Sequence, residues 1–323
     1  MNSGTSIFKK ILNHILESWI TTIQIITCII LFVNYYLLST NSSLGVDEVY
    51  KLSGYAQPTD IYNGQYWNLF VSNFLHFNLL HLLFNMYWLY ILGHKIEKEI
   101  PKLQYVVFVI SAGFVASISE LAFFGQSGIG YSGIGYALFG FIYIKAKFNN
   151  EFKDFLPQRI INLFFIWLFV CVIITYAKVL NIGNVAHFSG LLWGILIGYL
   201  SQIKNVFIRF GLPIFCFMFL SISLFYAPWS IIWLSHKAYE YSVKQNNNQA
   251  KIYYVKILQK EKTNEFAKQN LRQIEIYELS VKANKLFESN NIDSARFFYN
   301  QILKIDSTNA FALENLKLIE GEQ

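Results

Sequence analysis

Two short segments of the chain carry side chains that could do nucleophilic chemistry. Ser132 lies between glycines at the start of an apolar run, in the segment GYSGIGYALFG, and His187 opens another apolar run in the segment NVAHFSGLLWG. A serine at the start of a helix is most often an N-cap, whose hydroxyl accepts a backbone N–H. If the two runs pack together, however, the imidazole could take the hydroxyl proton and make the serine a nucleophile for acyl transfer.

A third segment, HFNLLHLLFNM, supplies groups that could stabilise an oxyanion. It begins at His76, and His81 and Asn85 follow four residues apart on one face of the predicted helix. Their side chains and the backbone N–H groups at the start of the Ser132 helix could donate hydrogen bonds to a developing negative charge. No carboxylate is placed to orient His187, so these residues predict a Ser–His dyad. The prediction includes no metal and no cofactor.

Two stripes of small residues predict how the Ser132 and His187 helices approach each other. The stripes consist of Gly133, Ala137 and Gly140 on one helix and of Gly190, Gly194 and Gly198 on the other. Such stripes let helix backbones nearly touch, which would bring His187 beside Ser132. Tyr136, one turn after Ser132, is expected to position the imidazole by stacking. Glu120 is expected to lie at the membrane interface and not to join Ser132 and His187 as a third catalytic residue.

The first 234 residues have the composition of a membrane protein, and the rest of the chain does not. Hydrophobic residues make up 54% of the 323 residues and charged ones 14%, whereas soluble domains average about 25% charged. Of the 46 charged residues, 24 follow Leu234. The net charge is +6, but the basic residues cluster between apolar runs and form no continuous face. Such clusters are explained by the orientation of spans in the membrane and not by nucleic-acid binding. Cys28, Cys171 and Cys216 lie in apolar runs, which predicts packing roles and no disulfide framework.

Seven apolar runs are predicted to cross the membrane, where a span needs about 20 mostly apolar residues. The fourth run is short, as expected for a helix whose first turn starts below the membrane surface. The seventh is interrupted by Pro213 and Pro228 and is expected to be one kinked or tilted span. Lys9 and Lys10, with the apolar run after them, are typical of a signal anchor that is retained. The predicted spans cover residues 19–38, 74–92, 103–124, 132–144, 160–177, 185–200 and 206–234.

The distribution of basic residues predicts which side of the membrane each loop faces. If the N-terminus is cytoplasmic, eleven Lys and Arg residues lie in the inside segments, against only Lys51 and Lys178 in the short outside segments. The positive-inside rule therefore favours a cytoplasmic N-terminus. Seven full spans put the C-terminal part outside, whereas a re-entrant seventh run would put it inside. In this orientation the polar side chains of the three segments share the outer half of spans that run in the same direction.

The three segments resemble the signature segments of the rhomboid family of intramembrane serine proteases, in the family's order and on its second, fourth and sixth spans. The resemblance covers about residues 67–200 and implies a rhomboid-like six-helix core, here with a seventh span. It implies that Ser132 is the nucleophile, that His187 is the general base and acid, and that His81, Asn85 and the Ser132 backbone form the oxyanion hole. The residues expected to support this site are Gly130, Gly133, Tyr136, Gly190, Gly194 and His76.

The resemblance also implies what the protein acts on and where. Family substrates are single-span membrane proteins, which are cut in or near the span after a small residue where the helix unwinds easily. We expect an integral multi-pass protein in contact with membrane lipid, in a bacterial plasma (inner) membrane. The sequence departs from the family in the first outer loop, where Asn68 follows Trp67 in place of the common arginine and Ser72 replaces a further histidine. These differences concern how the loop is held and not the dyad.

The C-terminal part contains an internal repeat. Residues 250–258 match residues 295–303, and residues 263–267 match residues 308–312, each at an offset of 45. Ala, Tyr and Leu at i, i+4 and i+8 line one helix face, the pattern of stacked helical hairpins. The pattern resembles a tetratricopeptide repeat, although the expected proline is Ser307. An ordinary small helical domain is the alternative, and a protein partner is expected on the repeats if they are present.

The predicted fold class is all-α, a polytopic transmembrane helix bundle followed by a small soluble α-helical repeat domain. The predicted function is that of an intramembrane serine endopeptidase acting on membrane-protein substrates. The alternative is a non-catalytic rhomboid-like protein that binds or escorts other spans through its repeats; the presence of both dyad residues favours the enzyme. The predicted parts are a cytoplasmic tail (1–17), a six-span catalytic core (18–205), a seventh span (206–235) and an extracytoplasmic tetratricopeptide-like domain (236–323).

Overall fold

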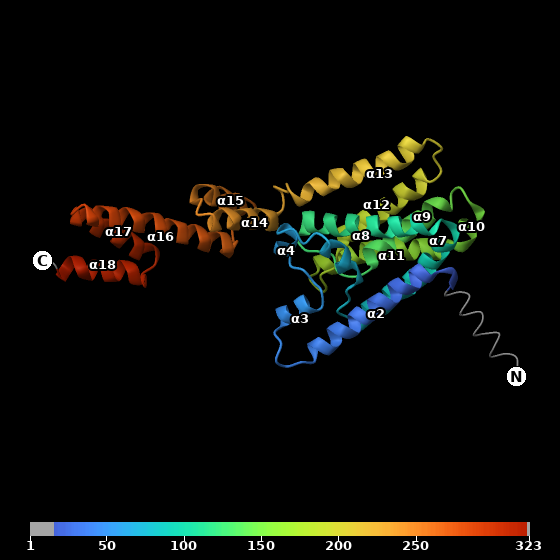
Figure 1. The fold of residues 1–323 in the computed structure, drawn as a ribbon, viewed down its shortest axis with the longest axis horizontal. Coiled ribbons are helices and arrows are strands. Elements are labelled where there is room, and N and C mark those ends of the chain that lie inside the picture. Colours follow the sequence, from blue (N-terminus) through green and yellow to red (C-terminus); the bar gives the residue numbers. More distant parts are fainter. Residues whose placement is uncertain (1–15, 322–323) are drawn as a thin grey trace. The chain divides into compact units, whose positions relative to one another are not determined.

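The computed structural model describes residues 16–321, and these residues form helices and connecting segments with no strand among them. The all-α class predicted from the sequence is therefore confirmed for the described part of the chain. Backbone contacts divide the chain into two compact units, Met1–Ser230 and Ile231–Gln323 (Figure 1). Nearly all of the expected cytoplasmic tail (1–17) lies outside the described residues.

Within the described residues, four helical segments are long and apolar enough to cross a membrane. They are α2 (Trp19–Ser39), α8 (Lys102–Phe124), α11 (Gln158–Tyr176) and α13 with its terminal 3₁₀ turn (Val206–Leu224). A fifth candidate is the pair Asn68–Phe74 and Leu79–Glu99, whose axes are bent by 96°. The first unit is thus a membrane protein with four to five spanning helices by length and composition.

Two further apolar helices of the first unit are shorter than a span, α9 (Ser132–Lys145) and α12 (Asn184–Leu200). α9 lies among the other helices, with α8 and α12 packed along it (Figure 1), and its Ile134, Leu138 and Phe139 are completely buried. Because neighbouring helices enclose α9, it has little contact with lipid and can be shorter than the hydrocarbon is thick. By contrast, no residue of α13 is buried.

The second predicted span begins later than expected from the sequence. We expected it from residue 74, but Ser72–Phe74 form a 3₁₀ turn, and α6 (Leu79–Trp88) starts only after Asn78. The Asn78 side chain accepts the backbone N–H groups of Leu80 and His81, which is an N-cap. The helix then passes through a π turn (Leu89–Gly93) into α7 (His94–Glu99). The N-cap at Asn78 therefore fixes the start of the helix that carries His81 and Asn85.

The long segment between α2 and α6 is built from short helices. These are α3 (Val46–Leu52), α4 (Pro58–Tyr62) and α5 (Asn68–Val71). The Asn73 side chain donates to the Leu69 carbonyl at 2.8 Å and to Ser117 Oγ on α8 at 3.0 Å. Asn68, where the resemblance led us to expect an arginine, is buried and donates to Gln65 Oε1 at 3.0 Å. Amide side chains thus hold this loop.

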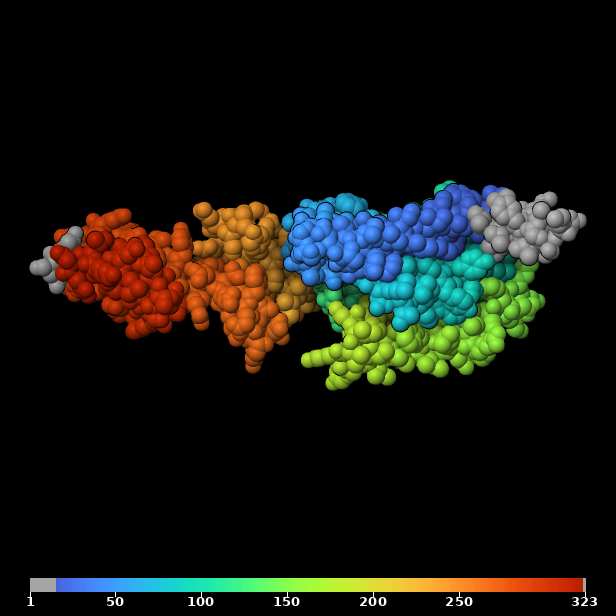
Figure 2. Space-filling model, turned by 90° about the horizontal axis from the view of Figure 1, so that it is seen from below, coloured from blue at the N-terminus to red at the C-terminus, as the bar shows by residue number. Residues whose placement is uncertain are grey.

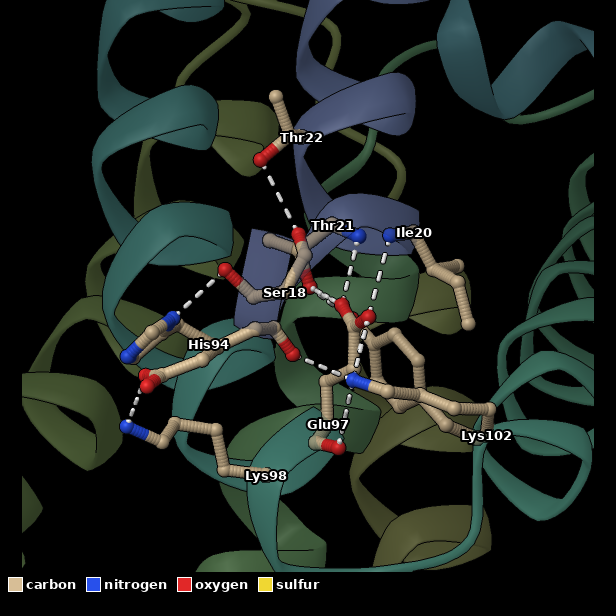
Figure 3. A network of polar contacts seen from close by, with 10 residues as sticks. Ser18, Ile20, Thr21, Thr22, His94, Glu97, Lys98 and Lys102 are labelled. Carbon is tan, nitrogen blue, oxygen red and sulfur yellow. Dashed lines mark hydrogen bonds and ion pairs between the residues drawn. The ribbon is translucent and has the colours of Figure 1, made fainter. Parts of the chain in front are cut away.

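A buried carboxylate joins the start of α2 to α7. Glu97 accepts the backbone N–H groups of Ile20 at 3.1 Å and Thr21 at 2.7 Å, and also the Thr21 hydroxyl at 2.7 Å (Figure 3). Lys102 Nζ at the start of α8 lies 2.9 Å from the same carboxylate. The Glu97 side chain is fully buried, and its charge is matched by the lysine and by the amides at the positive end of α2. The network fixes the ends of three helices to one another.

The seventh apolar run is not a single kinked helix to Leu234, as we expected. α13 (Val206–Ser221) continues through Pro213 and a 3₁₀ turn to Leu224, where the helix ends. The segment with Pro228 is a turn, and Trp229 Nε1 donates to the Ala122 carbonyl on α8 at 3.0 Å. The next helix, α14 (Ile231–Val243), belongs to the second unit. Pro228 thus separates two helices and does not kink one.

The second unit consists of helices that follow one another through short turns. After α14 come α15 (Asn247–Lys260), α16 (Glu265–Glu288), α17 (Ile292–Ile305) and α18 (Ala310–Gly321). The four helices after α14 are capped in the same way, because an asparagine side chain accepts the backbone N–H three residues further on. The capping residues are Asn246, Asn264, Asn291 and Asn309.

These caps show that the sequence repeat is also a structural repeat. Equivalent residues lie 45 positions apart, and the buried Tyr254 contacts Phe266 as the buried Tyr299 contacts Phe311. The ring centroids are 5.8 Å apart in both pairs, with interplanar angles of 66° and 65°. The second unit therefore contains two helical hairpins with the same internal packing.

Candidate active site

Ser132 is the first residue of α9, and its hydroxyl does not cap the helix. The N-cap position is taken by Tyr131, and no side chain caps the helix there. Instead, Ser132 Oγ lies 2.7 Å from Nε2 of His187 on α12. His187 is buried, whereas Ser132 is half-buried. The hydroxyl is thus paired with an imidazole that can take its proton, and the N-cap interpretation of this serine is wrong.

Direct backbone contact between α9 and α12 brings these side chains together. A Cβ at Gly190 would overlap the carbonyl oxygen of Gly133, and a Cβ at Gly194 would overlap that of Ala137. A Cβ at Gly140 would likewise meet the carbonyl oxygen of Leu191. Glycine is therefore required at these positions for the two helices to lie this close.

The His187 ring is held by packing. The Tyr136 ring lies against it with centroids 4.8 Å apart and a 33° angle between the planes, and the Tyr136 hydroxyl donates to the Phe164 carbonyl on α11 at 3.1 Å. Nδ1 of His187 is buried and has no hydrogen-bond partner among the described residues. No carboxylate therefore orients the imidazole directly.

The sequence predicts only a supporting role for His76, but its imidazole contacts three groups around the site. Its Nε2 accepts from Asn85 Nδ2 at 2.9 Å and faces the Tyr131 backbone N–H at 3.4 Å. Its Nδ1 lies 3.2 Å from the carbonyl oxygen of Phe74. In a neutral imidazole one nitrogen donates and the other accepts, so these contacts fit a ring with the proton on Nδ1. His76 thereby joins Asn85 to the backbone just before Ser132.

Gly130 leaves the space that His81 occupies. Its φ of +98° favours glycine, and a Cβ would lie 2.7 Å from Nε2 of His81 and 3.4 Å from Nδ2 of Asn85. The rings of His76 and His81 lie 5.0 Å apart. The loop before Ser132 therefore passes directly over the side chains expected to bind an oxyanion.

Ser132 and Asn85 line one small apolar pocket between α6 and α11, which lie side by side on the face seen in Figure 2. The ring centroids of Phe84 on α6 and Trp167 on α11 are 5.8 Å apart across this pocket. The other lining residues are Trp88, Gly135, Tyr136 and Phe164. Large aromatic side chains thus limit the space beside the Ser132 hydroxyl.

Glu120 lies in a different place from the one we expected. It is 3% exposed, inside the protein near the end of α8, and its Oε2 accepts the Ala186 backbone N–H at 2.9 Å. The sequence offered a signal for this, because a carboxylate within a span is costly and usually faces a cavity or a partner. The interfacial assignment of Glu120 is therefore wrong.

The described residues contain no group of three or more His, Cys, Asp and Glu side chains that could hold a metal ion. The cysteines are free thiols, and Cys28 and Cys171 are buried. The site itself presents a serine hydroxyl, an imidazole and hydrogen-bond donors. Together with the apolar helices, this defines a class: a membrane-embedded helical protein with a Ser–His pair.

Comparison with known proteins assigns the family within that class. A model of the rhomboid domain matches residues 63–204. The chain is 31% identical over 148 residues to the rhomboid protease GlpG of Haemophilus influenzae, an alignment that covers 43% of this chain and 72% of the relative. The chain belongs to the rhomboid family of serine endopeptidases.

Two other relatives are matched over less of their length. Identity is 33% over 137 residues to the rhomboid protease GlpG of Yersinia pseudotuberculosis, covering 42% of this chain and 48% of the relative. It is 31% over 150 residues to that of Photorhabdus laumondii, covering 45% of this chain and 51% of the relative. The chain therefore spans about half the length of these two proteins.

Proposed function

We propose that this protein is an intramembrane serine endopeptidase in which Ser132 is the nucleophile and His187 is the general base and acid. The observation that carries the proposal is the 2.7 Å contact between Ser132 Oγ and His187 Nε2 inside a helical membrane bundle. A serine and an imidazole at hydrogen-bond distance are the nucleophile and base of acyl transfer. Membership of the rhomboid family supports the same assignment.

The reaction follows from this pair. Ser132 Oγ attacks the scissile carbonyl carbon while His187 Nε2 takes the hydroxyl proton, and the carbonyl π electrons move onto the oxygen. When the C–N bond breaks, the imidazolium gives its proton to the leaving amine, and an ester to Ser132 remains. Water then attacks the ester with His187 again as base, and the proton returns to the serine.

The negative oxygen formed in each step needs hydrogen-bond donors. In this proposal they are the backbone N–H of Ser132 and the side chains of Asn85 and His81. The contacts of His76 with Asn85 and with the loop before Ser132 support a fixed position for these donors. Preorganised donors are usually the largest single contribution to stabilising an oxyanion.

The substrate in this proposal is the single span of another membrane protein. A helix hides its carbonyl groups in its own hydrogen bonds, so the segment to be cut must unwind before Ser132 can attack. The aromatic lining of the pocket supports a small side chain next to the scissile bond. The substrate would enter between α6 and α11, and the contact between Phe84 and Trp167 would have to open.

The membrane arrangement is also part of the proposal. We take α9 and α12 as short spans beside the longer helices, which gives a six-span rhomboid-like core with α13 as the seventh. The excess of basic residues in alternate loops supports a cytoplasmic N-terminus and an extracytoplasmic C-terminal unit. The bacterial relatives support a bacterial plasma membrane, with lipid around the bundle.

We assign the C-terminal unit as a tetratricopeptide-like repeat domain that binds a protein partner. The equivalent caps and Tyr–Phe contacts of its two hairpins support repeat packing. In repeat proteins each unit contacts its neighbours and the stack offers an extended binding surface. The partner could be a substrate or an accessory protein.

The test is cleavage of a reporter that contains one transmembrane segment, measured in membranes. The wild-type chain should cleave it, and Ser132→Ala and His187→Ala should not. Ser189→Ala is the matched control, because it removes a hydroxyl two residues from His187 whose one bond among the described residues is to the Ala186 carbonyl, at 3.3 Å. Cleavage at the wild-type rate in membranes that contain Ser132→Ala would mean that the dyad does not cut the reporter, which would overturn the proposal and favour a non-catalytic escort protein.

A further inference from the structure

The start of α12, where His187 lies, is held by a side chain from another helix. Glu120 on α8 is buried, and its Oε2 accepts the backbone N–H of Ala186 at 2.9 Å. The carboxyl carbon lies so near the loop that a Cβ at Gly183 would be 3.5 Å from it.

α12 has no N-cap of its own. The N-cap position is Gly183, which has no side chain, and no side-chain hydrogen bond caps the helix from there. The first N–H groups of a helix have no partner within the helix and need an outside acceptor when they are buried. A carboxylate is the best acceptor at this end, because the helix dipole is positive there. Glu120 therefore does for α12 what an N-cap side chain does for most helices.

The orientation of the His187 side chain depends on the backbone that this cap holds. Its Nδ1, the ring nitrogen that does not face Ser132, has no hydrogen-bond partner among the described residues. No acceptor at Nδ1 therefore fixes the orientation of the imidazole. The direction of Nε2 towards Ser132 is then set by the Tyr136 ring packed against the imidazole and by the backbone at residue 187. The amide that Glu120 holds belongs to the preceding residue.

We infer that Glu120 is a positioning residue for the proposed dyad: it caps α12 from α8 and so fixes the backbone that carries His187. This inference rests on the proposed function. Among the described residues, no hydrogen bond joins the Glu120 side chain to Ser132 or His187, so Glu120 is not a catalytic residue. Its effect is on the geometry of proton transfer between the Ser132 hydroxyl and the imidazole.

The same pair of helices offers a matched control for a purely structural link. Trp193 Nε1 on α12 donates to Ser111 Oγ on α8 at 3.0 Å. Ser111 lies nine residues before Glu120, which is about 13 Å along the helix. Ser111→Ala removes an acceptor from α8 and leaves a donor of α12 unpaired, as Glu120→Ala does, but far from the dyad.

The experiment measures the rate at which a fluorophosphonate inactivates the purified full-length protein in detergent, well below its unfolding temperature. The probe forms a P–O bond to the activated serine and releases fluoride, so its rate reports the dyad without any substrate. Glu120→Ala should lower this rate roughly ten- to a hundredfold, because a misplacement of catalytic groups by about 1 Å can cost about a hundredfold. Glu120→Gln keeps an oxygen acceptor and should lie between Glu120→Ala and wild type, and Ser111→Ala should react like wild type.

Glu120→Met is a second variant for the case in which Glu120→Ala does not fold. Methionine fills the volume of the glutamate side chain but has no oxygen to accept the Ala186 N–H. With a reporter substrate, the positioning role predicts a lower kcat with KM unchanged. Wild-type inactivation rates for both Glu120→Ala and Glu120→Met would overturn the inference, as would an equal loss in Ser111→Ala. Failure of the proposed function would give a different result: the reporter would be cleaved at the wild-type rate with Ser132→Ala, independently of the results for the Glu120 variants.

Discussion

Gly190 on α12 lies against the carbonyl group of Gly133 on α9, with no room for a side chain between the two helices. Gly133 directly follows Ser132, and Gly190 is less than one turn after His187. The contact therefore sets how far apart the helices are at the level of the proposed dyad. The 2.7 Å distance between Ser132 Oγ and His187 Nε2 depends on the backbones touching here.

Gly190→Ala should separate the two helices and slow the reaction. The added methyl group overlaps backbone and not a flexible side chain, so we expect a loss of about 1–3 kcal/mol of stability. We also expect a fluorophosphonate rate at least roughly tenfold lower, because the hydroxyl and imidazole are displaced. Gly211→Ala on α13 is the control, since a Cβ there has no atom within 4 Å. Equal effects of the two substitutions would contradict this account of the α9–α12 contact.

Glu97→Ala should destabilise the first unit strongly without changing the reactivity of Ser132. It removes the carboxylate partner of Lys102, which keeps its bonds to the backbone carbonyl groups of residues 17 and 97, and it leaves two backbone N–H groups of α2 without an acceptor (Figure 3). The Lys102 side chain is 41% exposed, so the main loss is at the buried N–H groups, each of which costs about 1–3 kcal/mol when it is left without a partner. The measurement is the unfolding temperature in detergent, with the fluorophosphonate rate taken below it. Glu99→Ala, which removes a more exposed carboxylate paired with Lys95, should cost at most about 1 kcal/mol; a similar loss in both variants would be evidence against the network.

Tyr136 allows the ring and the hydroxyl to be tested separately. Tyr136→Phe keeps the ring over His187 and loses only the bond to the Phe164 carbonyl, which is worth about 0.5–1.5 kcal/mol. Tyr136→Leu also loses the ring that packs against the imidazole. We expect kcat for a reporter substrate to fall slightly in the first variant and clearly in the second. Wild-type kcat in Tyr136→Leu would show that the imidazole does not need this ring.

The proposed seven spans make a prediction about topology. A reporter enzyme that is active only outside the cytoplasm should be active when it is fused after Gln323, because seven spans place the ends of the chain on opposite sides. The same reporter fused after Lys204, in the predicted inside segment before α13, is the internal control and should be inactive. Activity of a cytoplasmic reporter at Gln323 would instead mean that α13 does not cross the membrane completely.

Much of the arrangement could be predicted because it depends on local spacing. Glycines four residues apart on α12 define one helix face, and the structure has that face against α9. The start of α6 was predicted too early because hydropathy continues through the apolar residues before Asn78, and only the capping bonds show where the helix begins. The end of α13 was missed for a similar reason, since the apolar run passes through the turn at Pro228 into α14.

Glu120 shows the limit of reading motifs along the chain. Its partner amide belongs to Ala186, which is 66 residues away in sequence, and no pattern in either segment indicates the contact. Its burial, by contrast, could have been suspected from the cost of a carboxylate in a span. Long-range hydrogen bonds between a side chain and a backbone group leave no periodic signal, and for that reason the cap of α12 could be found only in the structure.

The most direct test of the central claim is to identify the residue that a fluorophosphonate modifies in the folded, detergent-solubilised protein, by mass spectrometry of its peptides. The account predicts an adduct on Ser132, and its loss or strong slowing in a folded His187→Ala variant. An adduct on another residue, no adduct on the folded wild-type chain, or full-rate labelling of Ser132 in His187→Ala would contradict it.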